Sequence, residues 1–289
     1  MIVMERMTPV LRPGVPGVMP DAWIVRPAGP STAPPVVVVH GINRDVENMA
    51  RMLAPRAQAT GRTLVLPHFS QTLWPRYQRA ACNKRADWAL LALMAALRAE
   101  GQVAEGRFDL SGFSGGAQFA HRFAWLYPAM VDRLCVTAPG WWTFPDASAS
   151  WPFGMGAAEA GNRPEAFWLG ANLYRFLNRR ITVCVGAHDT TRDPNLRQGE
   201  DIDAQQGPNR VHRARRWCAM AEAQAKAQGI DPAISLRILP GCGHNFADCV
   251  AEGGLDRDFV APAMPIVCNR KSADNTQISD PQTIERKVA

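Results

Sequence analysis

The chain has 289 residues, of which 47% are hydrophobic and 20% charged, and such a composition is typical of a globular protein with a sizeable core. Its 32 basic and 26 acidic side chains give a net charge of +6, and because the basic residues form no long block, we expect no nucleic-acid binding. The most apolar stretch, Ala86 to Leu97, is shorter than the roughly 20 residues of a transmembrane helix, so we expect no membrane span.

The N-terminal segment, residues 1–20, is rich in proline and glycine, and we expect it to be irregular. It contains no continuous apolar run of the kind found in signal peptides, so a cytoplasmic location is the default expectation. The seven cysteines follow neither a disulfide framework nor a zinc-binding spacing. Cys242 and Cys249 flank His244 and are the pair that we considered for a disulfide, although reduced thiols are favoured.

Short apolar strands alternate with helices between residues 21 and 262. The run Val36–Val39 has no polar interruption, which is typical of a strand buried on both faces of a parallel sheet. We therefore predict a single α/β domain over 21–262, with a mostly parallel central sheet, helices on both faces and a polar C-terminal tail over 263–289. The other predicted strands are Ala22–Arg26, Thr63–Leu66, a strand that begins at Phe108, Arg133–Thr137, Ile181–Val185 and Ile234–Leu239.

One segment, residues 139–178, interrupts this alternation and is dense in aromatic side chains. We interpret it as a lid-like insertion that forms a substrate wall, as a satellite of the core, or as both. Trp141 and Trp142 follow the preceding strand directly, so we expect them to line a substrate pocket.

The motif Gly112-Phe113-Ser114-Gly115-Gly116 joins the strand that begins at Phe108 to a predicted helix. A serine at such a junction lies on a sharp turn with its hydroxyl held above the sheet edge, and small residues are needed two positions before and after it. The five-residue pattern is weak alone, because turns collect glycine and serine. The segments around the motif therefore decide whether Ser114 is a catalytic serine or part of an ordinary turn.

Ligand sites of open parallel sheets lie at the carboxyl ends of the strands. The segment that follows the Val36–Val39 strand is His40-Gly41-Ile42; Ser114, Asp189 and His244 follow three later strands. The order Ser, Asp, His is that of the α/β-hydrolase triad. Over about Pro35 to Asp248 the sequence thus resembles the α/β-hydrolase superfamily, and its layout is most similar to the esterases and depolymerase-like hydrolases.

The resemblance implies a serine hydrolase that cleaves small carboxylic esters through an acyl-enzyme, without a metal or other cofactor. Ser114 is then the nucleophile, His244 the base and Asp189 the acid, while the N–H groups of Gly115 and Ile42 form the oxyanion hole. Asp193, in the same loop, competes with Asp189 for the role of acid.

Several alternatives stay open at this point. Thioesterase, amidase and peptidase activity use the same triad, and the fold also hosts non-catalytic binding proteins. His40 is expected to brace the oxyanion loop. Loop arginines at positions 76, 79, 192 and 197 would favour an anionic substrate if they faced the site, although a surface role is the simpler interpretation. The sequence leaves the oligomeric state open.

Overall fold

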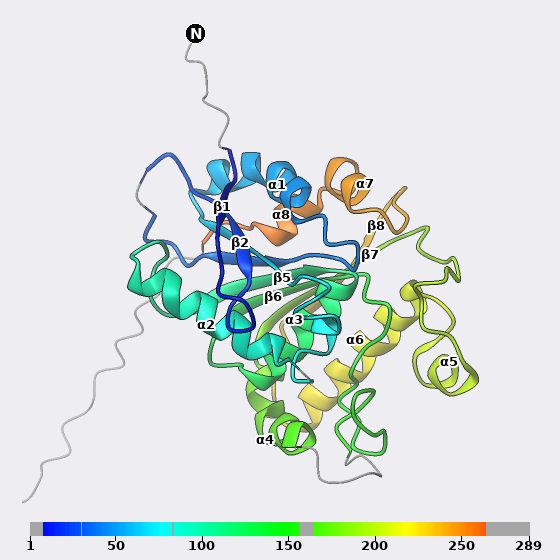
Figure 1. Cartoon of the computed structure of the whole chain (residues 1–289). Coiled ribbons are helices and arrows are strands. Elements are labelled where there is room, and N and C mark those ends of the chain that lie inside the picture. The colour runs from blue at the N-terminus through cyan, green and yellow to red at the C-terminus, as the bar shows by residue number, and fades with distance from the viewer. Residues whose placement is uncertain (1–7, 30, 83, 157–163, 264–289) are drawn as a thin grey trace, which may run out of the picture.

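A computed structural model describes residues 8–29, 31–82, 84–156 and 164–263 (Figure 1). In this part of the chain eight strands form one sheet in the order β1-β2-β4-β3-β5-β6-β7-β8. The pairs β1–β2 and β2–β4 are antiparallel, and the other pairs are parallel. The strands are β1 (Val10–Arg12), β2 (Asp21–Val25), β3 (Val36–Val39), β4 (Leu64–His68), β5 (Phe108–Phe113), β6 (Val131–Thr137), β7 (Arg180–Gly186) and β8 (Ile234–Leu239).

Helices cover both faces of the sheet, as Figure 1 shows. One face carries α1, α7 and α8, and the other carries α2, α3, α4 and α6. None of the described helices is both long and apolar enough to cross a membrane. The helices are α1 (Val46–Thr60), the 3-10 turn η1 (Tyr77–Arg79), α2 (Ala86–Ala99), α3 (Gly115–Leu126), α4 (Pro164–Leu177), α5 (Glu200–Gln206), α6 (Arg210–Ala227), α7 (Phe246–Ala251) and α8 (Leu255–Phe259).

Strand β3 illustrates why this sequence forms a two-sided sheet. Its four valines are fully buried, and they alternate between the two hydrophobic cores. Val37 and Val39 pack on the side of α2, α3, α4 and α6, whereas Val36 and Val38 pack on the side of α1, α7 and α8. An uninterrupted run of β-branched residues supplies apolar side chains to both faces of the sheet. The predicted α/β fold with a mostly parallel sheet is confirmed.

The N-terminal segment departs from its prediction, because the supposedly irregular residues 1–20 include strand β1. This strand has only three residues and pairs with β2 at the sheet edge, with Val10 opposite Ile24. Val10 and Leu11 are exposed, so the strand carries no buried apolar pattern that a sequence could reveal. Strand β1 forms because it pairs with β2. Residues 1–7 lie outside the described part, as does all of the predicted tail except its first residue.

The aromatic segment 139–178 is largely core. Trp142, Phe144 and Trp151 are buried in the hydrophobic core on the side of α2, α3, α4 and α6, together with Phe176 of α4. Helix α4 packs against α3 and α6 and connects β6 to β7, as a crossover helix of a parallel sheet does. Residues 157–163 lie outside the described part. The buried members of the segment form a satellite of the core, whereas Phe167 and Trp168 of α4 are exposed, and the lid-like role stays a prediction.

Candidate functional site

The turn between β5 and α3 holds Ser114 in a strained conformation. Its φ of 54° and ψ of −114° lie outside the regions that residues with a Cβ ordinarily adopt. A Cβ on Gly116 would come within 2.0 Å of the Val39 carbonyl oxygen, and one on Gly112 within 2.3 Å of the Gly116 oxygen. Glycine is therefore required at both positions, since strand, turn and neighbouring loop meet there without room for a side chain.

Three side chains from three strand ends form a continuous hydrogen-bonded array. His244 Nε2 lies 3.0 Å from Ser114 Oγ, and His244 Nδ1 lies 2.7 Å from Asp189 Oδ2. The imidazole stacks on Phe113, with 5.2 Å between the ring centroids. Because β5, β7 and β8 are parallel, their carboxyl ends share one sheet edge, and residues 130 positions apart come into contact. The structure thus brings Ser114, His244 and Asp189 together.

Asp189 and Asp193 occupy different positions around the imidazole. Asp189 is buried and contacts His244, whereas Asp193 is half-buried and contacts Arg210. Partial burial tends to raise the pKa of Asp193, but the hydrogen bond and charge of Arg210 outweigh it, so the pKa of Asp193 is lowered. The geometry favours Asp189 as the partner of the histidine.

Arg210, at the start of α6, links these two carboxylates. Its side chain is only 1% exposed, and its Nη1 lies 3.2 Å from Asp189 Oδ1, the oxygen that does not face His244. The same nitrogen forms an ion pair with Asp193. A buried arginine therefore contacts the carboxylate oxygen of Asp189 that does not face His244. Arg210 was not among the predicted site residues, because a single arginine at a helix start carries no sign of being buried.

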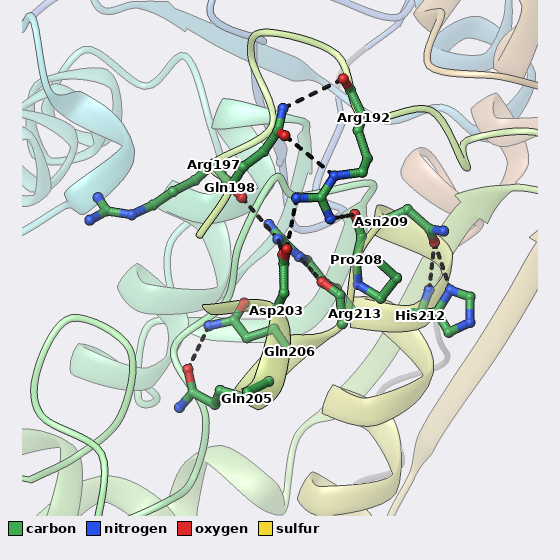
Figure 2. A network of polar contacts seen from close by, with 12 residues as sticks. Arg192, Arg197, Gln198, Asp203, Gln205, Gln206, Pro208, Asn209, His212 and Arg213 are labelled. Atoms are coloured by element: carbon green, nitrogen blue, oxygen red, sulfur yellow. Dashed lines mark hydrogen bonds and ion pairs between the residues drawn. The ribbon is translucent and has the colours of Figure 1, made fainter. Parts of the chain in front are cut away.

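A second arginine of α6 fastens the rest of the loop that carries Asp189. Figure 2 shows Arg213 and Arg192 converging on Asp203 of α5. The Nη2 atoms of Arg213 and Arg192 lie 2.9 Å and 2.7 Å from the two carboxylate oxygens. Arg213 is fully buried and also donates to the carbonyls of Gly207, Gly140 and Arg197. These contacts fix residues 190–207 against the first turn of α6.

On the other side of Ser114, an uncharged imidazole and a tyrosine hydroxyl help to hold the loop after β3. His40 Nδ1 lies 2.7 Å from the Gly41 carbonyl oxygen, and His40 Nε2 accepts the Phe69 N–H at 3.0 Å. The Tyr77 hydroxyl donates to the His40 carbonyl at 2.7 Å. Burial lowers the pKa of His40 to about 3, so the ring is neutral and its proton is on Nδ1. His40 occupies the bracing position that the sequence suggested.

The backbone nitrogens of Ile42 and Gly115 lie near each other beside Ser114. A Cβ placed on Gly115 would be 3.5 Å from the Ile42 nitrogen. Gly115 is the first residue of α3, and first-turn amides of a helix have no partner within the helix. The helix N-terminus adds partial positive charge at this position. The two residues that the resemblance assigned to an oxyanion hole are thus neighbours beside the serine turn.

A cavity of about 360 Å³ opens in front of Ser114 and His244. It combines an apolar floor, which includes Met49 and Phe246, with a ring of amide side chains and one carboxylate. Sequence reasoning did not select the polar residues of this wall, although their places near strand ends were the available signal. The lining residues are Gly41, Ile42, Asn43, Asp45, Asn48, Met49, Phe113, Ser114, Asn195, His244, Asn245, Phe246 and Ala247.

Trp141 and Trp142 do not line this cavity, which corrects the prediction that they contact substrate. Trp142 is fully buried and stacks on Trp217, with 4.6 Å between centroids. Trp141 is 6% exposed and packs under the guanidinium of Arg122, 4.0 Å from the ring centroid. Both rings are therefore packed in the interior, and neither is among the residues that line the cavity.

The loop arginines considered for anion binding are also absent from the cavity lining. Arg192 pairs with Asp203, and the Arg197 guanidinium lies over Phe153, 4.9 Å from its centroid. Cys242 and Cys249 are free thiols, so the disulfide that we considered is not formed. Within the described residues, no group of three or more histidine, cysteine or carboxylate side chains is arranged to hold a metal.

Comparison with known proteins gives structural but not sequence-family matches. No family model and no curated protein matches the sequence. Among solved structures, poly(aspartic acid) hydrolase-1 from Sphingomonas sp. KT-1 is similar, with a TM-score of 0.69 and 22% identity over 82% of this chain and 92% of that one. The poly(3-hydroxybutyrate) depolymerase LpqC from Bordetella parapertussis has a TM-score of 0.65 and 26% identity over 83% and 87%.

A third similar structure is an S-formylglutathione hydrolase from Agrobacterium tumefaciens, with a TM-score of 0.56 and 14% identity over 88% of this chain and 94% of that one. All three neighbours are hydrolases, and each is covered over nearly its whole length. The sheet order, the strained serine turn and these neighbours agree. The chain has the α/β-hydrolase fold, as the motifs at its strand ends implied.

Proposed function

We propose that this protein is a serine hydrolase that cleaves carboxylic esters through an acyl-enzyme intermediate. The observation that carries the proposal is the array Ser114–His244–Asp189, with contacts of 3.0 Å and 2.7 Å, on a serine whose φ is 54°. A nucleophile, a base in hydrogen-bond reach and a group that orients the base are the requirements for such chemistry.

In the proposed mechanism, Ser114 Oγ attacks the ester carbonyl carbon while His244 Nε2 accepts the hydroxyl proton. Asp189 accepts the Nδ1–H of His244, which selects the required tautomer and stabilises the imidazolium that forms. The N–H groups of Gly115 and Ile42 stabilise the oxyanion of the tetrahedral intermediate, and loss of one such donor typically costs about 10²–10³ in kcat.

Collapse of this intermediate expels the alcohol, which receives the proton from His244. The Ser114 ester that remains is hydrolysed by a water molecule whose proton passes to His244, and a second collapse releases the carboxylic acid while His244 returns that proton to Ser114 Oγ. Every proton thus moves through one nitrogen, His244 Nε2. No redox or metal-dependent step enters this scheme.

Ester substrates are preferred in this proposal to amides for two reasons. The neighbour at 26% identity is a depolymerase of poly(3-hydroxybutyrate), a polyester. Poly(aspartic acid), named for another neighbour, is a polyanion, whereas the cavity described here has a carboxylate in its wall and no lysine or arginine. Thioesters remain substrates of the same mechanism, since the attacked carbonyl and the oxyanion are equivalent.

Active-site labelling with a fluorophosphonate tests the proposal. We expect the probe to modify Ser114, identified by mass spectrometry of the labelled peptide, and we expect Ser114→Ala to abolish both labelling and cleavage of short 4-nitrophenyl esters. Ser148→Ala, which changes an exposed serine of a remote loop, is the matched control and should keep wild-type rates.

Two results would count against this function. Folded wild-type protein that neither reacts with the probe nor cleaves any ester in a series of varied acyl and alcohol size would favour a non-catalytic binding role. Ester cleavage that survives Ser114→Ala would place the chemistry elsewhere.

A further inference from the structure

The wall of the cavity has an unusual charge distribution for a protein with a net charge of +6. Among its lining residues, Asp45 is the acidic side chain, and no lysine or arginine is present. The polar remainder consists mainly of neutral amides, namely Asn43, Asn48, Asn195 and Asn245. Any substrate bound in front of Ser114 therefore meets a negative charge and several amide oxygens.

Asp45 occupies the N-cap position of α1, yet it does not serve as a cap. Aspartate is favoured at this position because its carboxylate normally accepts an N–H of the first helical turn. Here the side chain makes no such bond, and only its Oδ2 accepts a hydrogen bond, from Asn48 Nδ2 at 3.1 Å. The carboxylate thus contacts the side chain of Asn48 on its own helix, caps no backbone N–H, and lines the cavity.

The arginine side chains near Asp45 in the sequence contact other groups and not its carboxylate. The Arg44 guanidinium donates to the carbonyls of Ile42 and Phe69, at 2.7 Å and 2.8 Å. Arg51, one turn further along α1, pairs with Glu47. Within the described part of the chain, no ion pair includes Asp45. Its charge is therefore available to a ligand.

We propose that Asp45 determines substrate specificity by selecting esters that carry an ammonium group. This inference rests on the proposed ester hydrolase function. The carboxylate attracts the cation, and the side-chain oxygens of Asn43 and Asn195 supply further acceptors in the same wall. An anionic substrate would meet repulsion at the same place. The preference is the opposite of the one that loop arginines facing the site would have produced.

An isosteric ester series tests this specificity. The 4-nitrophenyl esters of 6-aminohexanoate and heptanoate differ only at the chain end, which is an ammonium or a methyl group, and the 4-nitrophenyl monoester of adipate ends in a carboxylate after one methylene fewer. Choline butyrate and 3,3-dimethylbutyl butyrate form the corresponding pair for the alcohol side. We expect Asp45→Asn to lower the ratio of kcat/KM for the cationic over the neutral ester about five- to ten-fold in at least one pair, and to raise kcat/KM for the adipate ester.

Glu47→Gln is the matched control, because it removes one carboxylate from the same helix outside the cavity lining. We expect it to leave both ratios unchanged, and we expect added salt to compress the wild-type ratio. Asparagine is also a favoured N-cap, so Asp45→Asn should fold normally.

The outcomes separate the two proposals. If neutral esters are cleaved but the cationic ratio is the same in wild type and Asp45→Asn for both pairs, the specificity inference is wrong and the ester hydrolase function stands. If wild type cleaves no ester of the series, the proposed function fails, and this inference fails with it.

Discussion

The two loops that flank Ser114 differ in whether an arginine pairs with their carboxylates. The loop after β7, which carries Asp189, is held by the buried arginines Arg210 and Arg213. The loop after β3, which runs from His40 to Asp45, is held by a neutral imidazole, a tyrosine hydroxyl and the guanidinium of Arg44, which donates to backbone carbonyls and to no carboxylate. Both loops contain a carboxylate close to the serine, but only the one in the first loop is matched by a cation.

This difference explains why the carboxylates of Asp189 and Asp45 suit different roles. A buried carboxylate needs compensation, and Asp189 receives it from Arg210 and from the imidazole of His244. Asp45 is exposed to solvent in the cavity and tolerates the absence of a partner. The first carboxylate is therefore suited to hold an internal cation, and the second to meet an external one.

The largest effect is expected from breaking the contact between Asp189 and His244. Asp189→Asn should lower kcat for 4-nitrophenyl esters about 10⁴-fold, because an amide donating to Nδ1 stabilises the wrong tautomer of the imidazole. Steady-state kinetics measures this effect. Asp193→Asn is the matched control and should cost far less, because Asp193 contacts Arg210 and not His244. A larger loss from Asp193→Asn than from Asp189→Asn would reverse the assignment of the acid.

Removal of Arg210 should weaken the fold and shift the pH dependence of the rate. Arg210→Met leaves two carboxylates without their buried cation, and we expect it to cost about 3 kcal/mol in the free energy of unfolding, measured by urea denaturation. In the variant molecules that stay folded, Arg210 no longer offsets the negative charge of Asp189. That charge therefore acts more strongly on His244. The acidic limb of the pH profile of kcat/KM should then move to higher pH.

A purely structural role for Arg210 would lower stability without moving this limb of the pH profile. Arg216→Met provides the comparison, because Arg216 lies on the same helix, is exposed and donates only to backbone carbonyls of α5. It should change neither the profile nor, beyond a few tenths of a kcal/mol, the stability.

The loop after β3 should be sensitive to acid because of His40. Its pKa is about 3 in the folded chain and about 6.5 when unfolded, so between these values only the unfolded state binds the proton. The contribution of His40 to stability is complete above pH 6.5 and is lost as the pH falls, by about 1.4 kcal/mol per pH unit. His121, whose pKa is also lowered by burial, acts in the same direction.

Urea unfolding between pH 6.5 and 5 measures this dependence. We expect the slope of unfolding free energy against pH to be smaller by about one proton in His40→Gln than in wild type. His212→Gln, at an exposed histidine, should keep the wild-type slope. Equal slopes in all three proteins would mean that His40 is not buried as a neutral group.

The sequence determined the features that depend on local pattern. Runs such as Val36–Val39 specify strands buried on both faces, because every side chain of such a run has to leave water. Gly112 and Gly116 around Ser114 specify the sharp turn, since no Cβ fits there. The alternation of strands and helices then predicted that Ser114, Asp189 and His244 meet at one edge of a parallel sheet.

Only the tertiary structure decided where loop and surface side chains are directed. Trp141 and Trp142 have the composition of a substrate wall, but they are buried against Arg122 and Trp217. Nothing local distinguishes the buried Arg210 from an exposed arginine, or the cavity-lining Asp45 from an ordinary helix cap. Their positions depend on contacts with residues distant in sequence, and such contacts leave no periodic pattern along the chain.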